Sequence, residues 1–324
     1  MTAPAARLRT LELYCGIGGV AAALGRDGEI AGAIDINTRA LAVYHHNFDH
    51  PTHAASLETL PAARLAAAQA TLWWLSPPCQ PFTRRGRGRD ADDPRSRSLL
   101  RLLEEIQHLR PRYLALENVP GFQGSKTHER LRAVLEQAGY GIAERLLCTT
   151  ELGVPMRRQR FYLLAAAEHP MPDPWPKPVP VPRLLATFLE PVRNQDPSLA
   201  VPASLARAYR GALDIVDARD PDALCACFTA AYGRSPVRSG SYLRLPGGGL
   251  RRFHPREILA LLGFPAAFRL PQDLTPPQAW RLVGNSLSVD AVRHVLGILR
   301  MIGASAPPPK DRGPRITDGR DQHS

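Results

Sequence analysis

The sequence predicts an α/β fold in which helices cover both faces of a mostly parallel sheet. Over residues 8–166, short apolar runs alternate with stretches whose apolar residues recur at helical spacing. Strand and helix patterns in repeated order are typical of such layered sheets. The chain has 324 residues, 44% of them hydrophobic, which suffices for one large core, alone or with a small satellite domain.

The predicted elements alternate along the first half of the chain. The strand patterns are LRTLELY (8–14), EIAGAID (29–35), TLWWL (71–75), RYLALEN (112–118), GIAERLLC (141–148) and RFYLLAAA (160–167). The helix patterns between them are VAAALGR (20–26), TRALAVYHHN (38–47), SRSLLRLLEEIQHL (96–109) and HERLRAVLEQAG (128–139).

A composition change near residue 168 indicates the end of the first domain. The stretch HPMPDPWPKPVPVPR (169–183) is too rich in proline for helices or sheet ladders. A less regular region follows, and helix patterns return in HPREILALLGF (254–264) and SLSVDAVRHVLGILRMI (286–302). The predicted division is a first domain over 1–182, a small domain over 183–250, a return to the first domain over 251–303 and a disordered tail over 304–324.

The net charge of +11 permits a nucleic-acid partner. Of the 41 basic residues 38 are arginine, which contacts phosphate bidentately and stacks on bases. The alternative is a genome that favours arginine and alanine codons.

Neither membrane insertion nor secretion is expected. No apolar run approaches the roughly 20 residues that cross a bilayer, and the N-terminus MTAPAARLRTLELY lacks a signal-peptide pattern. Five scattered cysteines do not suggest a disulfide framework, so a reducing cytoplasm is the expected location.

The first motif is LELYCGIGGVAAAL (11–24), a strand that runs into glycines and then a helix. Gly16, Gly18 and Gly19 allow a tight turn where a ligand can approach the backbone. Asp35 ends the next strand, where a carboxylate can accept hydrogen bonds from ribose hydroxyls. The pair favours an adenosine-bearing cofactor; the alternative is a plain strand-to-helix turn.

The second motif is SPPCQPFTRRGRGRD (76–90). Two prolines fix the backbone, so that Cys79 emerges at the carboxyl end of a buried strand, where open α/β sheets bind ligands. The arginines that follow can favour a nucleophilic thiolate. A structural cysteine is the alternative. The loop 80–95 is expected to be mobile when empty, because it lacks apolar anchors.

Two further motifs bring charged side chains toward Cys79. LALENVPGF (114–122) delivers Glu117 at the end of the adjacent strand, where apolar walls can keep a carboxyl protonated. GVPMRRQRFYLLAA (153–166) places Arg158 and Arg160 at a strand start, and their spacing of two puts both on one face. A structural carboxylate and solvated arginines are the alternatives.

The last motif is WRLVGNSLSVDAV (280–292), in which Asn285 or Ser286 stands where it can cap the final helix; capping alone is one of two readings of these residues. No metal is expected, since Cys225-x-Cys227 lacks a second pair at ligand spacing.

Taken in order, LELYCGIGG, SPPCQPFT, LENVPGF, RRQR and GNSLSV resemble the motifs of the cytosine carbon-5 methyltransferases. The resemblance spans about residues 8–300. It implies a Rossmann-like, S-adenosylmethionine-dependent methyltransferase fold, with 183–250 as a small target-recognition domain. It also implies that Cys79 adds to carbon-6 of cytosine, that Glu117 protonates ring nitrogen 3, and that Arg158 and Arg160 orient the base.

The resemblance further implies which residues surround the cofactor S-adenosylmethionine. They are Tyr14, Gly16, Ile17, Gly18, Gly19, Asp35, Ile36, Leu57, Glu58, Asn285 and Ser286. Met156 stands where the family often has glutamine.

Three details resemble the branch that methylates cytosine-38 in the anticodon loop of aspartate tRNA. They are the threonine in PPCQPFTR, the segment CFT at 227–229 and LRRFHPREILALLGFP (250–265). Bases of an anticodon loop are unstacked, so a cytosine is extruded more easily than from duplex DNA. Residues expected to contact the substrate are Arg84, Arg85, Asn118, Cys227, Phe228 and Thr229.

The expected protein is therefore a monomeric, cytoplasmic tRNA methyltransferase. A DNA cytosine methyltransferase and an inactive nucleic-acid-binding relative are the alternatives. A thiol redox protein is disfavoured, because the chain has no Cys-x-x-Cys pair.

Overall fold

The computed structural model describes residues 7–82, 90–167 and 169–304. Arg84 and Arg85 lie outside these residues, as do residues 83–89 of the loop predicted to be mobile and the tail beyond residue 304. Within the described chain the central sheet has seven strands in the order β3-β2-β1-β4-β5-β8-β6. The bounds are β1 Leu8–Leu13, β2 Gly28–Asp35, β3 Thr52–Ala54, β4 Leu72–Leu75, β5 Tyr113–Asn118, β6 Tyr140–Cys148 and β8 Gln159–Ala167.

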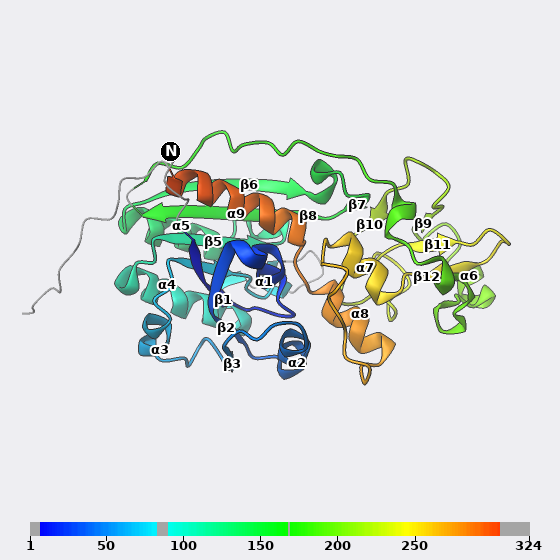
Figure 1. Ribbon diagram of the computed structural model, residues 1–324, viewed down its shortest axis with the longest axis horizontal. Coiled ribbons are helices and arrows are strands. Elements are labelled where there is room, and N and C mark those ends of the chain that lie inside the picture. The colour runs from blue at the N-terminus through cyan, green and yellow to red at the C-terminus, as the bar shows by residue number, and fades with distance from the viewer. Residues whose placement is uncertain (1–6, 83–89, 168, 305–324) are drawn as a thin grey trace, which may run out of the picture.

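The sheet is parallel from β3 to β5, and β8 is inserted antiparallel between β5 and β6. The six predicted strands are therefore present and the α/β prediction is confirmed (Figure 1). β3 was missed because three residues without an apolar run give no strand pattern.

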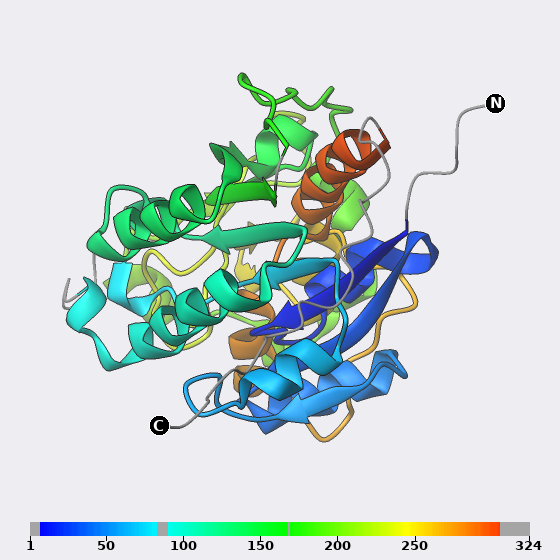
Figure 2. The same ribbon diagram turned by 90° about the vertical axis from the view of Figure 1, so that its left-hand side faces the viewer.

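Helices cover both faces of the sheet (Figure 2). Apolar side chains of α1 (Gly19–Leu24), α2 (Thr38–Asn47) and α9 (Val289–Ala304) share one core cluster. Those of α3 (Ala62–Ala67), α4 (Arg97–Leu109) and α5 (Lys126–Gln137) fill the other. Each fully buried valine or leucine stabilises the fold by about 1.5–3 kcal/mol, so the two clusters hold the sheet rigidly between them.

The second half of the chain forms smaller sheets beside the large one (Figure 1). β9 (Ile215–Val216), β11 (Tyr242–Arg244) and β12 (Leu250–Arg252) make one of them. In the other, β10 (Cys225–Ala226) pairs with β7 (Met156–Arg157) from the first half of the chain. β12 spans residue 250, where the sequence predicts a domain boundary.

Three further helices belong to this half: α6 (Ala203–Ala208), α7 (Pro255–Leu261) and α8 (Pro276–Gly284). α8 leads directly into the segment Asn285–Ser288, and α9 then returns onto the large sheet (Figure 1). None of the helices in the described residues is both long and apolar enough to cross a membrane.

Candidate active site

A cavity of about 350 Å³ lies where β1, β2, β4 and β5 end. We call it the central cavity. Its position follows from the parallel sheet, because the loops after the carboxyl ends of parallel strands gather at one edge. Predicted site residues that line it are Tyr14, Gly16, Ile17, Gly19, Asp35, Ile36, Cys79, Glu117, Arg158, Arg160, Asn285 and Ser286.

Two glycines of the β1–α1 turn are required by close packing. Gly18 has a φ of +90°, and a Cβ there would lie 2.6 Å from the Phe48 ring. A Cβ on Gly19 would lie 2.9 Å from the Leu287 side chain, and Leu287 itself lines the central cavity. Both distances are shorter than real Cβ contacts, so larger residues would displace the turn.

The Asp35 carboxylate joins this turn to the loop after β2. One oxygen accepts a hydrogen bond from the Gly16 amide at 2.8 Å, and the other accepts from the Asn37 amide at 2.7 Å. Burial raises the pKa of Asp35, while the amide hydrogen bonds oppose that rise.

These residues fit an adenosine-bearing cofactor. Ile36 lines the central cavity with 72% of its surface exposed, which is unusual for an apolar side chain next to a packed core. The planar face of an adenine would cover it. Asp35 beside it supplies the oxygen acceptors that ribose hydroxyls need.

Cys79 is held at the end of a short, fixed loop after β4. The Asn118 side chain donates a hydrogen bond to the Pro77 carbonyl at 3.3 Å, and the Phe82 amide donates to the Cys79 carbonyl at 3.0 Å. Burial raises the pKa of the Cys79 thiol, and Arg160 opposes the rise. At neutral pH the resting thiol is therefore mostly protonated.

Glu117 and Arg160 form an ion pair in the wall next to Cys79. The Arg160 Nε lies 3.3 Å from the Glu117 Oε1, and Glu117 is 7% exposed. Burial raises the pKa of Glu117, whereas Arg160 and Arg158 lower it. As β4 and β5 pair directly, the predicted neighbourhood of Cys79 and Glu117 is present.

Arg158 and Arg160 meet at a second sulfur atom. Arg158 Nη1 lies 3.4 Å from the Cys227 Sγ and Arg160 Nη2 lies 3.6 Å from it. Burial alone would raise the pKa of Cys227, but Arg160 and Arg158 outweigh burial and lower it. Arg158 also donates to the carbonyls of Phe228, at 3.3 Å, and Ser286.

Two expectations about local structure were wrong. Arg158 does not start a strand, since it lies between β7 and β8, although its side chain converges with that of Arg160. Asn285 and Ser286 do not cap the final helix, because α8 ends at Gly284 and α9 begins only at Val289. The Ser288 hydroxyl accepts the hydrogen bond of the Ala291 amide at 3.4 Å instead.

Seven predicted residues do not line the central cavity. They are Gly18, Leu57, Glu58, Asn118, Cys227, Phe228 and Thr229. Leu57 is buried in a core cluster on the face of α4, and Glu58 lies 3.9 Å from Arg97. Phe228 is 1% exposed and packs against aromatic rings. Leu57, Glu58 and Phe228 are thus core or surface residues in this structure.

The sequence reasoning missed several residues of the cavity wall. They are Cys15, Asn37, Ala40, Ser76, Gln80, Val119, Leu282 and Leu287. Most are neighbours of the motif residues, so sequence adjacency was the available signal. Within the described ranges, no cluster of three or more histidine, cysteine or acidic side chains could hold a metal ion.

The fold and this cavity define an α/β enzyme that brings a cysteine, a buried carboxyl and two arginines next to an adenosine-type site. The chain matches the family described as C-5 cytosine-specific DNA methylase over residues 8–187 and 225–300. It belongs to this family, as the resemblance predicted.

Relatives from several organisms are similar over nearly the whole chain. A *Schizosaccharomyces pombe* protein named tRNA (cytosine(38)-C(5))-methyltransferase is 33% identical, covering 90% of this chain and 97% of the relative. A *Homo sapiens* protein of the same name is 30% identical over 90% and 99%. The crystal structure of *S. pombe* Dnmt2 methyltransferase superposes with a TM-score of 0.79 at 32% identity, covering 90% and 98% of the two chains.

Proposed function

We propose that this chain transfers a methyl group to carbon-5 of a cytosine in the anticodon loop of a tRNA, at position 38. The observation that carries the proposal is the convergence of Cys79, Glu117 and Arg160 on one cavity beside the glycine turn. The names of the similar proteins support tRNA as the substrate. Residues 183–250 are proposed to form the target-recognition domain.

Cys79 acts as the nucleophile in the proposed reaction. Its sulfur forms a bond to carbon-6 of the cytosine, and the 5,6 double bond supplies the electron pair that makes carbon-5 nucleophilic. Because burial raises the pKa of Cys79, the thiolate must form in the complex. The positive charges of Arg160 and Arg158 favour it there.

Glu117 supplies the proton for ring nitrogen 3. Its raised pKa keeps part of the carboxyl protonated, so it can donate to the nitrogen that gains electron density during thiolate addition. Arg160, 3.3 Å away, positions this carboxyl. Arg158 and Cys227 hold Arg160 from the other side. Asn118 fixes the loop of Cys79 through the Pro77 carbonyl.

Tyr14, Gly16, Ile17, Asp35, Ile36 and Asn285 would hold S-adenosylmethionine in the remaining part of the central cavity. When bound, this cofactor supplies the electrophilic methyl group that carbon-5 takes. Transfer of the carbon-5 proton to solvent water then restores the 5,6 double bond and expels the Cys79 thiolate, and ring nitrogen 3 returns its proton to Glu117. The protein is further proposed to be a monomer and to act in the cytoplasm.

Parallel methyl-transfer assays test the proposal. Purified protein, methyl-labelled S-adenosylmethionine and either total tRNA or duplex DNA are incubated, and the modified base is mapped. Label at cytosine-38 of a tRNA is the expected result. The family description and a *Dictyostelium discoideum* relative named DNA (cytosine-5)-methyltransferase, 28% identical, make DNA the second candidate. Label in DNA but not in tRNA would replace the first proposal.

A further inference from the structure

A second cavity of about 220 Å³ lies apart from the central one. Its walls come from the segment 196–199, from the start of α7 and from the connection 269–276 that leads into α8. Among the residues that the structure describes, none lines both this cavity and the central one. A water molecule occupies about 30 Å³ of liquid, so this space has room for a group the size of one nucleobase.

The polar groups in this wall include a donor and an acceptor. His254 Nδ1 accepts a hydrogen bond from the Arg256 amide at 3.3 Å. Burial and Arg193 lower the pKa of His254, so the neutral ring carries its hydrogen on Nε2. The Asp196 Oδ1 accepts from Ser198. Its Oδ2 has no hydrogen-bond partner among residues that the structure describes.

Apolar walls and a basic rim complete the second cavity. Leu199, Leu270 and Leu274 contribute the apolar surface. Arg269 is exposed at the rim, and its backbone is fixed to α2 by two hydrogen bonds with the Asn47 side chain, at 2.7 and 2.8 Å. Its Nη1 donates to the Ala266 and Phe268 carbonyls, so the Nε and Nη2 groups are the ones that can donate to a phosphate.

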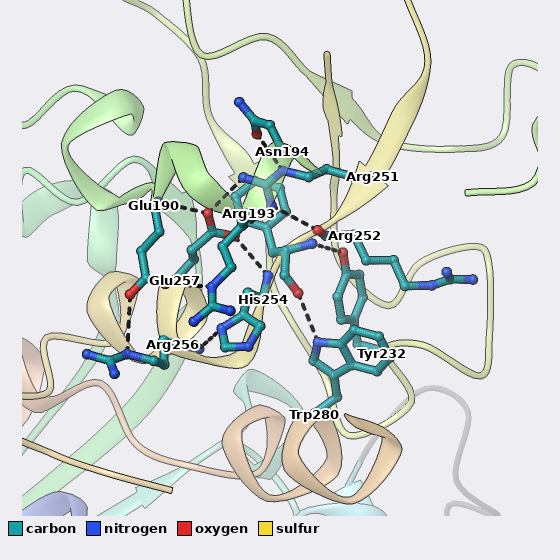
Figure 3. A network of polar contacts seen from close by, with 11 residues as sticks. Glu190, Arg193, Asn194, Tyr232, Arg251, Arg252, His254, Arg256, Glu257 and Trp280 are labelled. Atoms are coloured by element: carbon teal, nitrogen blue, oxygen red, sulfur yellow. Dashed lines mark hydrogen bonds and ion pairs between the residues drawn. The ribbon is translucent and has the colours of Figure 1, made fainter. Parts of the chain in front are cut away.

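The wall on the α7 side is rigid before any ligand binds. Arg251 and Glu257 form a buried, two-pronged ion pair with distances of 2.8 and 2.7 Å (Figure 3). Glu257 also accepts hydrogen bonds from the amides of His254, at 2.8 Å, and Glu190, at 3.0 Å. Such a saturated network fixes the backbone that presents His254.

Helix α8 connects the two cavities. Pro276 and Ala279 near its start line the second cavity, whereas Leu282 and Gly284 at its end line the central one. With a rise of 1.5 Å per residue, these lining residues are separated along the helix axis by about 4.5 Å (Ala279 to Leu282) to about 12 Å (Pro276 to Gly284). Neighbouring nucleotides of one RNA loop span such a distance.

We propose that the second cavity binds one unstacked nucleobase from the same RNA loop whose cytosine enters the central cavity. This inference rests on the proposed function. A nucleobase has donors and acceptors on its edges and apolar faces, which match Asp196, His254 and the leucine walls. The adjoining phosphate meets Arg269. A free phosphate would make no apolar contact with the leucine side chains. A hydrocarbon would cover the Asp196 carboxylate without giving it a hydrogen-bond partner.

Two variants test the second cavity with a tRNA anticodon stem–loop. Leu274→Trp fills the space, and Arg269→Ala removes the exposed charge at the rim. Gln272→Trp adds the same bulk at an exposed position of the same connection that does not line the cavity. We expect both cavity variants to weaken stem–loop binding about tenfold, the effect of one lost base or phosphate contact. Gln272→Trp should bind the stem–loop as tightly as wild type does. The Tm of all three variants and their affinity for S-adenosylmethionine should equal those of wild type.

Abasic substitutions identify the bound base. In stem–loops with one abasic loop position each, wild-type protein should lose about tenfold in affinity at one position besides the methylated cytosine. Leu274→Trp should show no further loss there, as the two changes remove the same contact. Equal effects of Leu274→Trp and Gln272→Trp, or a loss at the target cytosine alone, would overturn the inference. Binding with the expected pattern but without methyl transfer would refute the proposed function and leave the second cavity standing.

Discussion

Replacing Glu12 by glutamine should remove a pH-dependent loss of stability. Glu12 lies on β1, is 1% exposed and accepts a hydrogen bond from the Val20 amide at 3.1 Å. The Tyr44 hydroxyl is 3.4 Å from its other oxygen and 3.1 Å from the His50 Nδ1. Desolvation by burial raises the pKa of Glu12 from 4.5 to about 8, although the Val20 and Tyr44 hydrogen bonds oppose it.

The size of the effect follows from proton linkage. The folded protein binds the Glu12 proton more tightly than the unfolded chain, so stability is fully present below about pH 4.5 and is lost as pH rises toward about 8. At about 1.4 kcal/mol per pKa unit, the loss reaches about 4 kcal/mol at pH 8. A glutamine oxygen can accept from Val20 as the carboxyl does, and the rest of the amide can pair with the Tyr44 hydroxyl, which donates to Glu12 Oε2 in the wild type, but an amide does not ionise.

Urea unfolding at about pH 5 and about pH 8 measures this effect. The free energy of unfolding of Glu12→Gln minus that of wild type should grow by about 3–4 kcal/mol between the two pH values, because at about pH 5 the wild type has already lost about 1 kcal/mol. Glu129→Gln, at an exposed position on α5, should show no such growth. A difference for Glu12→Gln that stays constant with pH would refute the reasoning.

Three other outcomes follow from the site. Cys79→Ala should lower the rate of methyl transfer by at least about 10³-fold. Binding of S-adenosylmethionine, measured by equilibrium dialysis, should be retained; full activity of the variant would show that Cys79 is not the nucleophile. The single-turnover rate of wild type should pass through a maximum as pH rises, because burial raises the pKa of Cys79, whose thiolate attacks, and Glu117 must stay protonated to donate to ring nitrogen 3; a flat profile would contradict this. Gly284→Ala should lower stability by about 1–3 kcal/mol in thermal unfolding, since its Cβ would lie 2.3 Å from the Thr229 backbone; an unchanged Tm would show that the segments can move apart.

The sequence by itself determined the large sheet and the chemistry at its edge. Apolar runs such as TLWWL marked its long strands, since residues buried on both faces of a sheet leave an unbroken pattern. Cys79 and Glu117 each follow such a run, and the carboxyl ends of adjacent parallel strands must meet at one edge. The local sequence pattern and a general rule of sheet topology were therefore enough to predict that these two residues lie close together.

Only the tertiary structure decided what packs against that edge. The contacts of Cys227 with Arg158 and Arg160 join positions nearly 70 residues apart, and neither short strand nearby has a sequence pattern. Helix α8, which begins with two prolines, was not predicted, so the second cavity was not foreseen. The burial that raises the pKa of Glu12 also comes from elements distant in sequence. Such features depend on contacts across the folded chain, which periodicity along the sequence does not record.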